Sequence, residues 1–190
     1  MADNIVFSSG SLGWDSNKLE WLNPSKKFEL SNTLCIWPDA GPDLWRRTFY
    51  TPNGPGTELV KDNAAGLCFT SKDDMLIVET KFKVDAVNQF DQGGIYIRFD
   101  HEHWLKTGLE YVDGQHRVSC VVTNEFSDWS TQPWTSGELK IRVFRQKNSY
   151  VVEYHNGSEW AFFRIAHIKS GSLEAKASFN LYERIVLVYF

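Results

Sequence analysis

Residues 103–123 read HWLKTGLEYVDGQHRVSCVVT, and this stretch decides the fold. Polar and apolar side chains alternate on both sides of Asp113-Gly114, as they do in strands that bury only one face. Asp-Gly between two such runs favours a two-residue type I′ turn. The segment is therefore predicted to be an antiparallel β-hairpin.

The turn also fixes which residues face each other. Counting back from Val112 opposite Gln115 pairs Glu110 with Arg117, Gly108 with Ser119, Lys106 with Val121 and Trp104 with Thr123. A slip of one residue would bury Lys106 and Glu110, so the register is strongly specified. The opposite face is predicted to be core, and it carries Leu105, Thr107, Leu109 and Tyr111 against Val118, Cys120 and Val122.

Two further turns place a second row of side chains. Asn156-Gly157 is read as a hairpin turn that pairs Glu153 with Trp160. A short turn at Lys147-Asn148 would bring Arg142 opposite Glu153. We therefore expect Arg142, Glu153 and Trp160 in one polar and aromatic row, on a sheet that the sequence does not identify.

Strand-like patterns recur along the whole chain, and no segment of useful length shows convincing helical periodicity. No internal repeat, low-complexity tract or linker divides it, so residues 1–190 are expected to form one domain. About a dozen strands separated by turn signals predict an all-β fold, either a two-sheet sandwich or a barrel. The expected strands are 34–37, 47–50, 66–70, 75–84, 94–99, 103–112, 115–123, 138–145, 149–155, 159–166, 175–180 and 184–190.

Composition limits the partners and the compartment. A net charge of −4 with no basic stripe argues against nucleic acid as a main partner. No apolar run approaches the length that spans a bilayer, and the first residues, MADN, lack the features of a secretory signal. The three cysteines, Cys35, Cys68 and Cys120, are odd in number and widely separated, so reduced thiols and a cytoplasmic location are expected. Cys120 is predicted to be a buried core residue.

The hairpin face opposite the predicted core is the best candidate binding site. Its side chains, with Arg98 expected beside them, are Trp104, Lys106, Glu110 and Arg117. Such a face can be a solvated surface with ordinary cross-strand ion pairs, each worth roughly 0.2–1 kcal/mol. Trp104 and the nearby Trp129 count against that interpretation, because a large exposed apolar ring usually has a partner.

Asp128-Trp129-Ser130 follows a short strand and is expected at the rim of this face. An Asp and a Trp in a loop can hydrogen-bond sugar hydroxyls and stack on a pyranose ring. They can equally form an Asx-type turn with a packed ring. The neighbouring polar face favours the binding interpretation.

The sequence supports catalysis and metal binding less well than it supports ligand binding. Glycoside hydrolysis needs two carboxyl groups, about 5–5.5 Å apart for retention or about 6.5–9.5 Å for inversion. Glu110 is one candidate, but Arg117 opposite it would lower its pKa instead of preparing a proton donor. His101-Glu102-His103 does not have the spacing of a known metal motif and is interpreted as a tight turn. No metal or cofactor is predicted.

A resemblance rests on five segments: DLWRRT at 43–48, FDQGG at 90–94, WLKTGLEYVDG at 104–114, SCVVT at 119–123 and SDWS at 127–130. They resemble the regulation-of-enolase-like family, a group of domains without assigned activity, from about Trp14 to the C-terminus. The resemblance implies the concanavalin A-like lectin/glucanase fold, a jelly-roll sandwich of two antiparallel sheets. In this fold a concave sheet commonly holds carbohydrate or peptide.

Three functions remain open, and each belongs to a different class. The leading one is a non-catalytic binding module for a carbohydrate or related polyhydroxylated metabolite, which would bind on the concave sheet face. The second is a cytoplasmic interaction or regulatory domain that contacts a glycolytic enzyme such as enolase, as the family name suggests. The third is a glycoside hydrolase or lyase that uses Glu110. The expected ligand contacts are Trp104 and Trp129 by stacking, Arg98, Lys106 and Glu110 by hydrogen bonding, and Asp128 and Trp45 at the rim.

Overall fold

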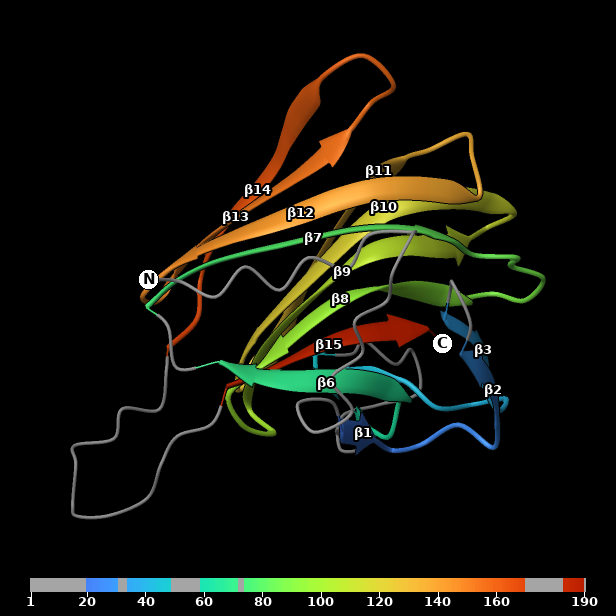
Figure 1. Ribbon diagram of the computed structural model, residues 1–190, viewed down its shortest axis with the longest axis horizontal. Coiled ribbons are helices and arrows are strands. Elements are labelled where there is room, and N and C mark those ends of the chain that lie inside the picture. Colours follow the sequence, from blue (N-terminus) through green and yellow to red (C-terminus); the bar gives the residue numbers. More distant parts are fainter. Residues whose placement is uncertain (1–19, 31–33, 49–58, 72–73, 170–182, 190) are drawn as a thin grey trace.

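The fold is an antiparallel jelly-roll sandwich of two large sheets (Figure 1). A computed structural model describes residues 20–30, 34–48, 59–71, 74–169 and 183–189. Within these ranges every regular secondary-structure element is a β-strand, and every pair of neighbouring strands is antiparallel. No helix in this part of the chain is long and apolar enough to cross a membrane. The predicted fold class is confirmed.

The larger sheet has seven strands in the order β1-β6-β15-β8-β9-β10-β11. The late strand β15 lies between β6 and β8, so early and late segments share one sheet (Figure 1). The bounds are β1 Glu20–Leu22, β6 Gly66–Ser71, β8 Gln92–Arg98, β9 His103–Val112, β10 Gln115–Asn124, β11 Phe126–Pro133 and β15 Glu183–Tyr189.

The smaller sheet has four strands in the order β14-β13-β12-β7. Its bounds are β7 Met75–Lys83, β12 Glu138–Gln146, β13 Ser149–His155 and β14 Trp160–His167. Two separate hairpins complete the described structure. They are β2 Lys27–Leu30 with β3 Leu34–Trp37, and β4 Leu44–Arg47 with β5 Leu59–Asp62.

The main hydrophobic core fills the space between the two sheets. Every second side chain of a strand points into it, because strand side chains alternate between the two faces. Burying one such aliphatic side chain away from water contributes roughly 1.5–3 kcal/mol to the stability of the fold. Members from the central strands of both sheets include Ile95, Leu105, Leu109, Val118, Cys120, Val122, Val78, Ile141, Val143 and Val152.

Strands β9 and β10 pair in the predicted register. Glu110 faces Arg117 across the two strands, and each of the other predicted pairs is also present. Asp113 and Gly114 have φ angles of 52° and 80°, which is the positive sign that a type I′ turn requires at both positions. The hairpin prediction is confirmed, and with it the assignment of the core face.

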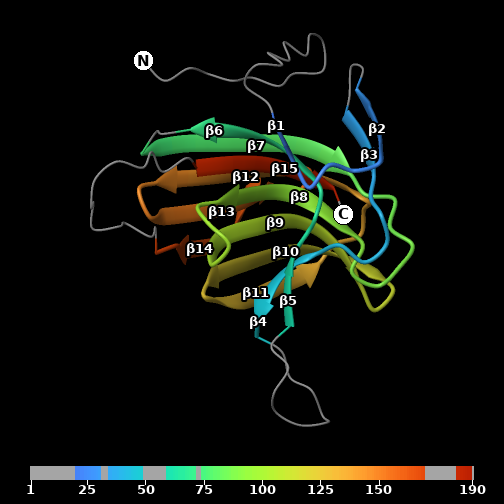
Figure 2. The same cartoon turned by 90° about the horizontal axis from the view of Figure 1, so that it is seen from below.

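A second hydrophobic cluster lies on the side of the seven-stranded sheet that faces away from the four-stranded sheet, here called its outer face. The β4–β5 hairpin crosses this face near β10 and β11 (Figure 2). The backbone N–H of Arg46 in β4 donates to Ser127 Oγ in β11 over 2.9 Å, which ties the hairpin to the sheet. The buried members of the cluster are Leu44, Ala64, Cys68, Tyr96, Trp104 and Val121.

The β13–β14 connection differs from the prediction. Four residues, 156–159, form the loop, so His155 pairs with Trp160, and a register shift in β13 places Glu153 opposite Phe162. The expected pairing of Glu153 with Trp160 is therefore wrong. Arg142 does face Glu153, as predicted, and both lie on the four-stranded sheet.

Several strand limits also differ. The strand expected at 47–50 is β4 at Leu44–Arg47, and residues 128–130, expected in a rim loop, lie inside β11. Strands β1, β2 and β5, each of three or four residues, were not predicted. Segments this short contain few alternations, although β3, which is also four residues long, was predicted. The strand expected at 175–180 lies outside the described residues.

All three cysteines are free thiols. Cys120 is completely buried, as predicted, and burial raises the pKa of its thiol to about 12. Cys68 is buried in the second cluster, whereas Cys35 is exposed.

Candidate functional site

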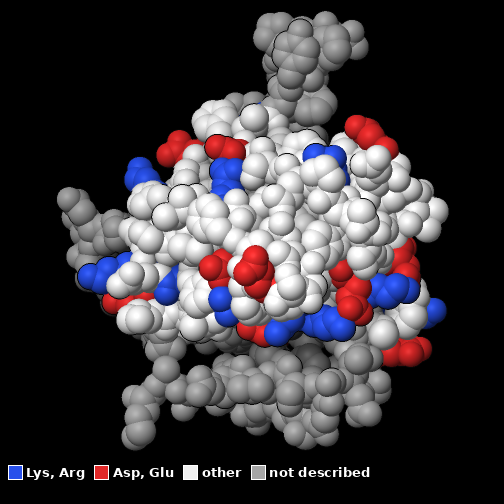
Figure 3. Space-filling view, turned by 90° about the horizontal axis from the view of Figure 1, so that it is seen from above, with Lys and Arg blue, Asp and Glu red and all other residues white. Residues whose placement is uncertain are grey.

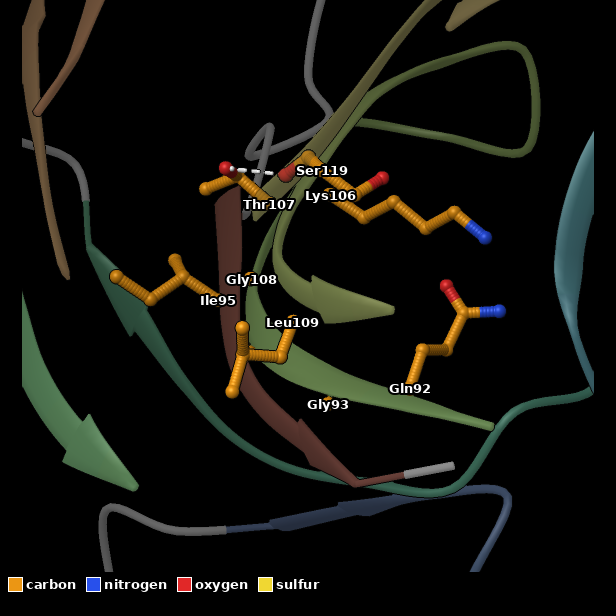
Figure 4. A pocket seen from close by; sticks show the side chains of 9 residues that line it. Gln92, Gly93, Ile95, Lys106, Thr107, Gly108, Leu109 and Ser119 are labelled. Atoms are coloured by element: carbon orange, nitrogen blue, oxygen red, sulfur yellow. Dashed lines mark hydrogen bonds between the residues drawn. The ribbon is translucent and has the colours of Figure 1, made fainter. Parts of the chain in front are cut away.

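Strand alternation gathers four polar side chains on the outer face of the seven-stranded sheet. Gln92 of β8 pairs with Glu110 of β9, and Lys106 lies on the same side of β9 because it is four residues away. Ser119 of β10 lies on this side as well. Figure 4 shows the Gln92 amide, the Lys106 ammonium and the Ser119 hydroxyl on one side of the strands, with Leu109 on the other.

Glu110 is the buried acid of this group, with 5% of its surface exposed. Its Oε2 accepts hydrogen bonds from Ser119 Oγ at 2.6 Å and from Trp129 Nε1 at 3.0 Å. Burial raises the pKa of the Glu110 carboxyl, because the charged form loses its hydration. The Lys106 ammonium and the two hydrogen bonds lower this pKa, whereas the Asp43 carboxylate raises it further. The net result is a raised pKa.

Arg117 does not have the role that the sequence suggested. It faces Glu110 in the ladder, but its Nε donates to Thr131 Oγ1 in β11 over 2.7 Å. The prediction that Arg117 lowers the pKa of Glu110 is therefore wrong. Lys106 does lower the pKa of Glu110, but burial outweighs it.

Asp43 joins the site from a different part of the chain. It directly precedes β4, and its Oδ1 accepts hydrogen bonds from Lys106 Nζ and Gln92 Nε2, each over 3.0 Å. Its own backbone N–H donates to Asn63 Oδ1 at 2.9 Å, which holds the two ends of the β4–β5 hairpin together. The charge of Lys106 is thus paired with Asp43, and the hairpin contributes one wall of the site.

Sequence reasoning missed Asp43, Gln92 and Ser119 as site residues. Ser119 could have been found, since its predicted partner Gly108 lies on the same face as Glu110. Asp43 could not have been found from alternation, because its hairpin does not belong to the sheet that it covers.

Two glycines form the floor of the site. Gly94 of β8 and Gly108 of β9 are direct partners. A Cβ on Gly94 would lie 2.1 Å from the Thr107 carbonyl oxygen, and a Cβ on Gly108 would lie 2.0 Å from the Gly93 carbonyl oxygen. The backbones approach too closely for any side chain. A cavity of about 10 Å³ lies at these glycines, which is the size of one water or hydroxyl group. Its lining side chains come from both faces of the sheet, with Gln92, Lys106 and Ser119 on the outer face and Ile95, Thr107 and Leu109 on the core face.

Trp129 provides the aromatic surface beside this cavity. The ring is 39% exposed, and its Nε1 donates both to Glu110 Oε2 and to Ser119 Oγ, at 3.0 and 2.9 Å. The edges of Trp45 and Phe90 pack against it, with ring centroids 6.4 and 6.5 Å away. Two fixed donor contacts and two neighbouring rings hold the indole in one orientation. Trp45 thus lies beside Trp129, and its expected role at the rim of a binding site stays a prediction.

Trp104 is not part of an exposed surface. Only 2% of it is accessible, and it packs against Tyr96 at 5.7 Å between centroids, within the cluster beneath the β4–β5 hairpin. The stacking role expected of Trp104 requires correction, because no ring face is open to a ligand. Its exposure was predicted from alternation alone, which does not reveal that a second hairpin covers the strand.

Asp128 lies on the opposite face from Trp129, since consecutive residues of a strand point to opposite sides. Its carboxylate forms an ion pair with Arg164 of β14 at 2.9 Å, while Arg164 also donates to Ser130 Oγ at 2.6 Å. The expectation that Asp128 and Trp129 border one depression is therefore wrong. Asp128 instead links the edges of the two sheets.

Arg98 is held by a partner of its own. Its guanidinium forms a two-pronged ion pair with Asp62 of β5, and it donates to the Tyr96 hydroxyl over 3.1 Å. Arg98 lies on the same face as Lys106 but anchors the β4–β5 hairpin instead of facing the cavity.

Comparison with known proteins gives the family. A family model described as "Protein of unknown function (DUF1349)" matches residues 21–180. The chain belongs to the DUF1349 family. "Regulation of enolase protein 1" of Saccharomyces cerevisiae is 29% identical to this DUF1349 chain over 150 residues, which are 77% of this chain and 72% of the yeast protein. The resemblance inferred from the sequence motifs is confirmed.

Solved structures support the fold of this DUF1349 chain. A functionally unknown protein from Saccharomyces cerevisiae matches with a TM-score of 0.75 and 23% identity, covering 92% of this chain and 88% of the yeast chain. Xylan beta-1,4-xylosidase from Bacillus halodurans C-125 matches 66% of this chain with 26% of its own, at a TM-score of 0.56 and 12% identity. The GH43 BlXynB protein from Bacillus licheniformis matches 65% of this chain with 25% of its own, at a TM-score of 0.54 and 15% identity. At these identities the likeness concerns the fold alone.

The site of this DUF1349 chain combines polar side chains with an aromatic ring. Glu110 accepts hydrogen bonds, and the Trp129 ring is partly exposed. Both are hydrogen-bonded to Ser119, which lines the small cavity. No cluster of three or more His, Cys, Asp or Glu that could hold a metal occurs among the described residues.

Proposed function

We propose that this DUF1349 chain is a non-catalytic binding module for a carbohydrate or related polyhydroxylated metabolite, bound on the outer face of the seven-stranded sheet. One observation carries the proposal. The buried carboxylate of Glu110 accepts a hydrogen bond from Nε1 of Trp129, a tryptophan that is partly exposed. An acceptor fixed beside an aromatic surface matches a sugar, which presents hydroxyl donors next to an apolar ring face.

The dimensions of the site suggest how such a ligand would lie. The cavity above Gly94 and Gly108 holds one water-sized group, so it accepts a single hydroxyl and not a ring. The ring would remain outside, over Trp129, with Trp45 at its border. A ligand hydroxyl in this cavity must form hydrogen bonds at least as good as those it makes in water if affinity is to be gained. Gln92, Lys106 and Ser119 are the polar side chains that line the cavity, and Ser119 is in turn hydrogen-bonded to Glu110.

The same dimensions favour binding over hydrolysis. A glycosidase places its two carboxyl groups on either side of the scissile bond, which requires space for both sugars. Asp43 is the carboxylate coupled to Glu110, but Lys106 and Gln92 already occupy one of its oxygens. Neither acid lines the small cavity, so this cavity does not place a scissile bond between them.

The proposal is tested by calorimetric titration with a panel of neutral mono- and oligosaccharides and polyols. Glu110→Gln keeps the size of the side chain and removes the charge, and Trp129→Ala removes the ring. Each is expected to weaken the best ligand about tenfold or more. Asp128→Ala is the matched control, because it alters the neighbouring residue on the other face and should leave affinity unchanged. Full affinity in folded Glu110→Gln and Trp129→Ala proteins would overturn the proposal.

A second candidate function, contact with a metabolic enzyme such as enolase, is favoured by a row of apolar side chains. The row crosses the four-stranded sheet on the face away from the core, and strand pairing aligns Ile77, Phe144, Val151 and Ile165. Ile77 and Ile165 are 61% and 68% exposed. Figure 3 views the molecule from above Figure 1, the side on which β13 and β14 lie. It shows a broad uncharged surface that is bordered by charged side chains and interrupted by a further group of acidic and basic ones. Exposed apolar patches of this kind mark protein contacts.

The yeast relative is named for regulation of enolase, and that name directs the test of the second function. Purified enolase is mixed with this chain, and the complex is measured by analytical ultracentrifugation. Ile165→Asp should abolish an enolase complex, while Glu110→Gln should leave it intact. A complex that resists Ile165→Asp would exclude the apolar row as the contact.

The three free thiols fit a reducing cytoplasmic location, which a glycolytic partner requires.

A further inference from the structure

A second and larger cavity lies at one end of the four-stranded sheet. It has a volume of about 520 Å³, within the range of cavities that hold small molecules. The β11–β12 connection and the β13–β14 loop form its walls, and both lie at the same end of the sandwich (Figure 1). It shares no lining residue with the cavity above Gly94 and Gly108. Its lining consists of Lys81, Trp134, Thr135, Ser136, Glu138, Lys140, His155, Asn156 and Gly157.

Two lysines supply positive charge to this end cavity. Lys81 forms an ion pair with Glu138 at 2.7 Å, and Lys140 forms one with Glu79 at 2.8 Å. All four side chains are at least 40% exposed, and ion pairs this exposed contribute only about 0–1 kcal/mol. Both ammonium groups can therefore exchange a carboxylate partner for an anionic ligand at little energetic cost.

The β13–β14 loop contributes further donors. His155 Nδ1 accepts the backbone N–H of Gly157 at 3.2 Å, which leaves Nε2 as the donor of the ring. Asn156 Oδ1 accepts from Ser158 N, Ser158 Oγ and Glu159 N at 2.9–3.0 Å. Because the oxygen of Asn156 is fully used by the loop, its amide NH₂ is the group left to bind a ligand.

Trp134 forms an aromatic wall of the cavity. Its Nε1 donates to the Glu138 carbonyl oxygen at 2.9 Å, and its ring meets Tyr154 edge to face at 5.4 Å between centroids. These two contacts fix the orientation of the indole. The wall therefore offers a rigid apolar surface of the kind on which a sugar ring stacks.

We propose that this end cavity binds an anionic sugar, with its ring against Trp134 and its carboxylate or phosphate between Lys81 and Lys140. Donors outnumber acceptors in the lining, since Glu138 is the one carboxylate among the nine lining residues. A donor-rich cavity is complementary to a ligand rich in acceptor oxygens. A sugar acid and a sugar phosphate share this chemistry. The proposal does not depend on the site around Glu110.

Titration calorimetry with glucuronate and glucose 6-phosphate tests the proposal, with glucose and inorganic phosphate as the comparison ligands. At least one of the two anionic sugars should bind about tenfold more tightly than either comparison ligand. The stronger of the two identifies the anionic group. If inorganic phosphate bound as tightly as the anionic sugars, the site would be one for the anion alone, and the proposed role of Trp134 would be overturned. Glucose binding as tightly as both anionic sugars would also overturn the proposal.

Variants locate the binding on the molecule. Lys81→Ala combined with Lys140→Ala should lower the affinity about tenfold or more, because both charges are removed. Lys83→Ala is the matched control: this lysine lies two residues from Lys81, pairs with Asp85 and does not line the cavity. Glu110→Gln should leave this affinity unchanged, which separates the proposal from that for the sheet face. Undiminished binding by the folded double variant would overturn it.

Discussion

At Glu110, burial and local partners act in opposite directions on one carboxyl group. Desolvation raises its pKa, while Lys106 and the hydrogen bonds from Ser119 and Trp129 lower it. Ser119 and Trp129 both donate to the same oxygen, Oε2, so Oε1 is the oxygen that a ligand hydroxyl can meet. A carboxylate that is poorly solvated and partly unshared gains more from a donated hydrogen bond than one in water does.

The raised pKa of Glu110 predicts a pH dependence of stability. Because the folded-state pKa lies above the unfolded value, the stabilisation from this group is fully present below the unfolded pKa. It is lost as the pH rises through the folded pKa. Glu110→Gln does not titrate, so its free energy of unfolding should increase relative to the wild type as the pH rises from about 4 to about 8. Urea denaturation across this range measures the difference, and a difference that does not change with pH would contradict the shift.

The two tryptophans of the outer face should respond differently to truncation. Trp104→Ala removes a ring that is 2% exposed and should lower the free energy of unfolding by about 3–5 kcal/mol. Trp129→Ala removes a ring that is 39% exposed together with its donor to Glu110, and a loss of about 1–3 kcal/mol is expected. Chemical denaturation of both variants checks the order, and a larger loss at Trp129 would show that the cluster around Trp104 is not the tighter one.

Among the elements, those joined by two-residue turns could be predicted in detail. Asp113-Gly114 sets the β9–β10 register, and the turn at Lys147-Asn148 likewise places Arg142 opposite Glu153. The β13–β14 register could not be predicted from the sequence. The Asn156 side chain accepts hydrogen bonds within a loop longer than two residues, and β13 shifts its pairing with β14 before that loop. Alternation is a property of one strand, so it predicts neighbours within a sheet but not what covers it.

The β4–β5 hairpin shows the consequence for the candidate site. Alternation correctly placed Trp104, Lys106 and Glu110 on one face. It could not show that β4 and β5 cover Trp104, nor that the Asp43 carboxylate reaches Lys106 from the edge of that hairpin. Contacts between segments more than sixty positions apart leave no signal in the local pattern of either segment.

The β8–β9 pair depends on its two facing glycines. A Cβ on Gly94 would lie 2.1 Å from a backbone oxygen, and no change of side-chain rotamer can relieve that contact. Gly94→Ala should therefore separate the strands and lower the free energy of unfolding by more than about 3 kcal/mol. Gly137→Ala is a suitable comparison, because its Cβ would meet the Val84 oxygen at 3.1 Å and requires only a small adjustment. Equal losses for the two variants, measured by urea denaturation, would contradict the close approach of β8 and β9.

On the scale of the whole molecule, the three candidate binding surfaces are separate. The Glu110 site is on the seven-stranded sheet, the apolar row crosses the other sheet, and the cavity near Trp134 lies at one end. Arg164 joins the edges of the two sheets through Asp128 and Ser130. Because no residue lines both cavities, occupation of one leaves the polar groups of the other free to act.

The position of β15 leads to a prediction about how the chain unfolds. Residues 183–189 pair with β6 on one side and β8 on the other, so in the described sheet β15 is the hydrogen-bonded link between the strands of the Glu110 site and β1 and β6. If the chain is one domain, as its sequence suggests, β15 cannot open without dividing the larger sheet. The backbone amides of β15 that bond to β6 and β8 should then exchange with solvent at the free energy of global unfolding, as those of β9 and β10 should. Native-state hydrogen exchange at increasing denaturant measures both sets. If the β15 amides exchanged at a free energy well below that of the β9 and β10 amides, β15 would open as a separate unit. The single-domain proposal would then fail.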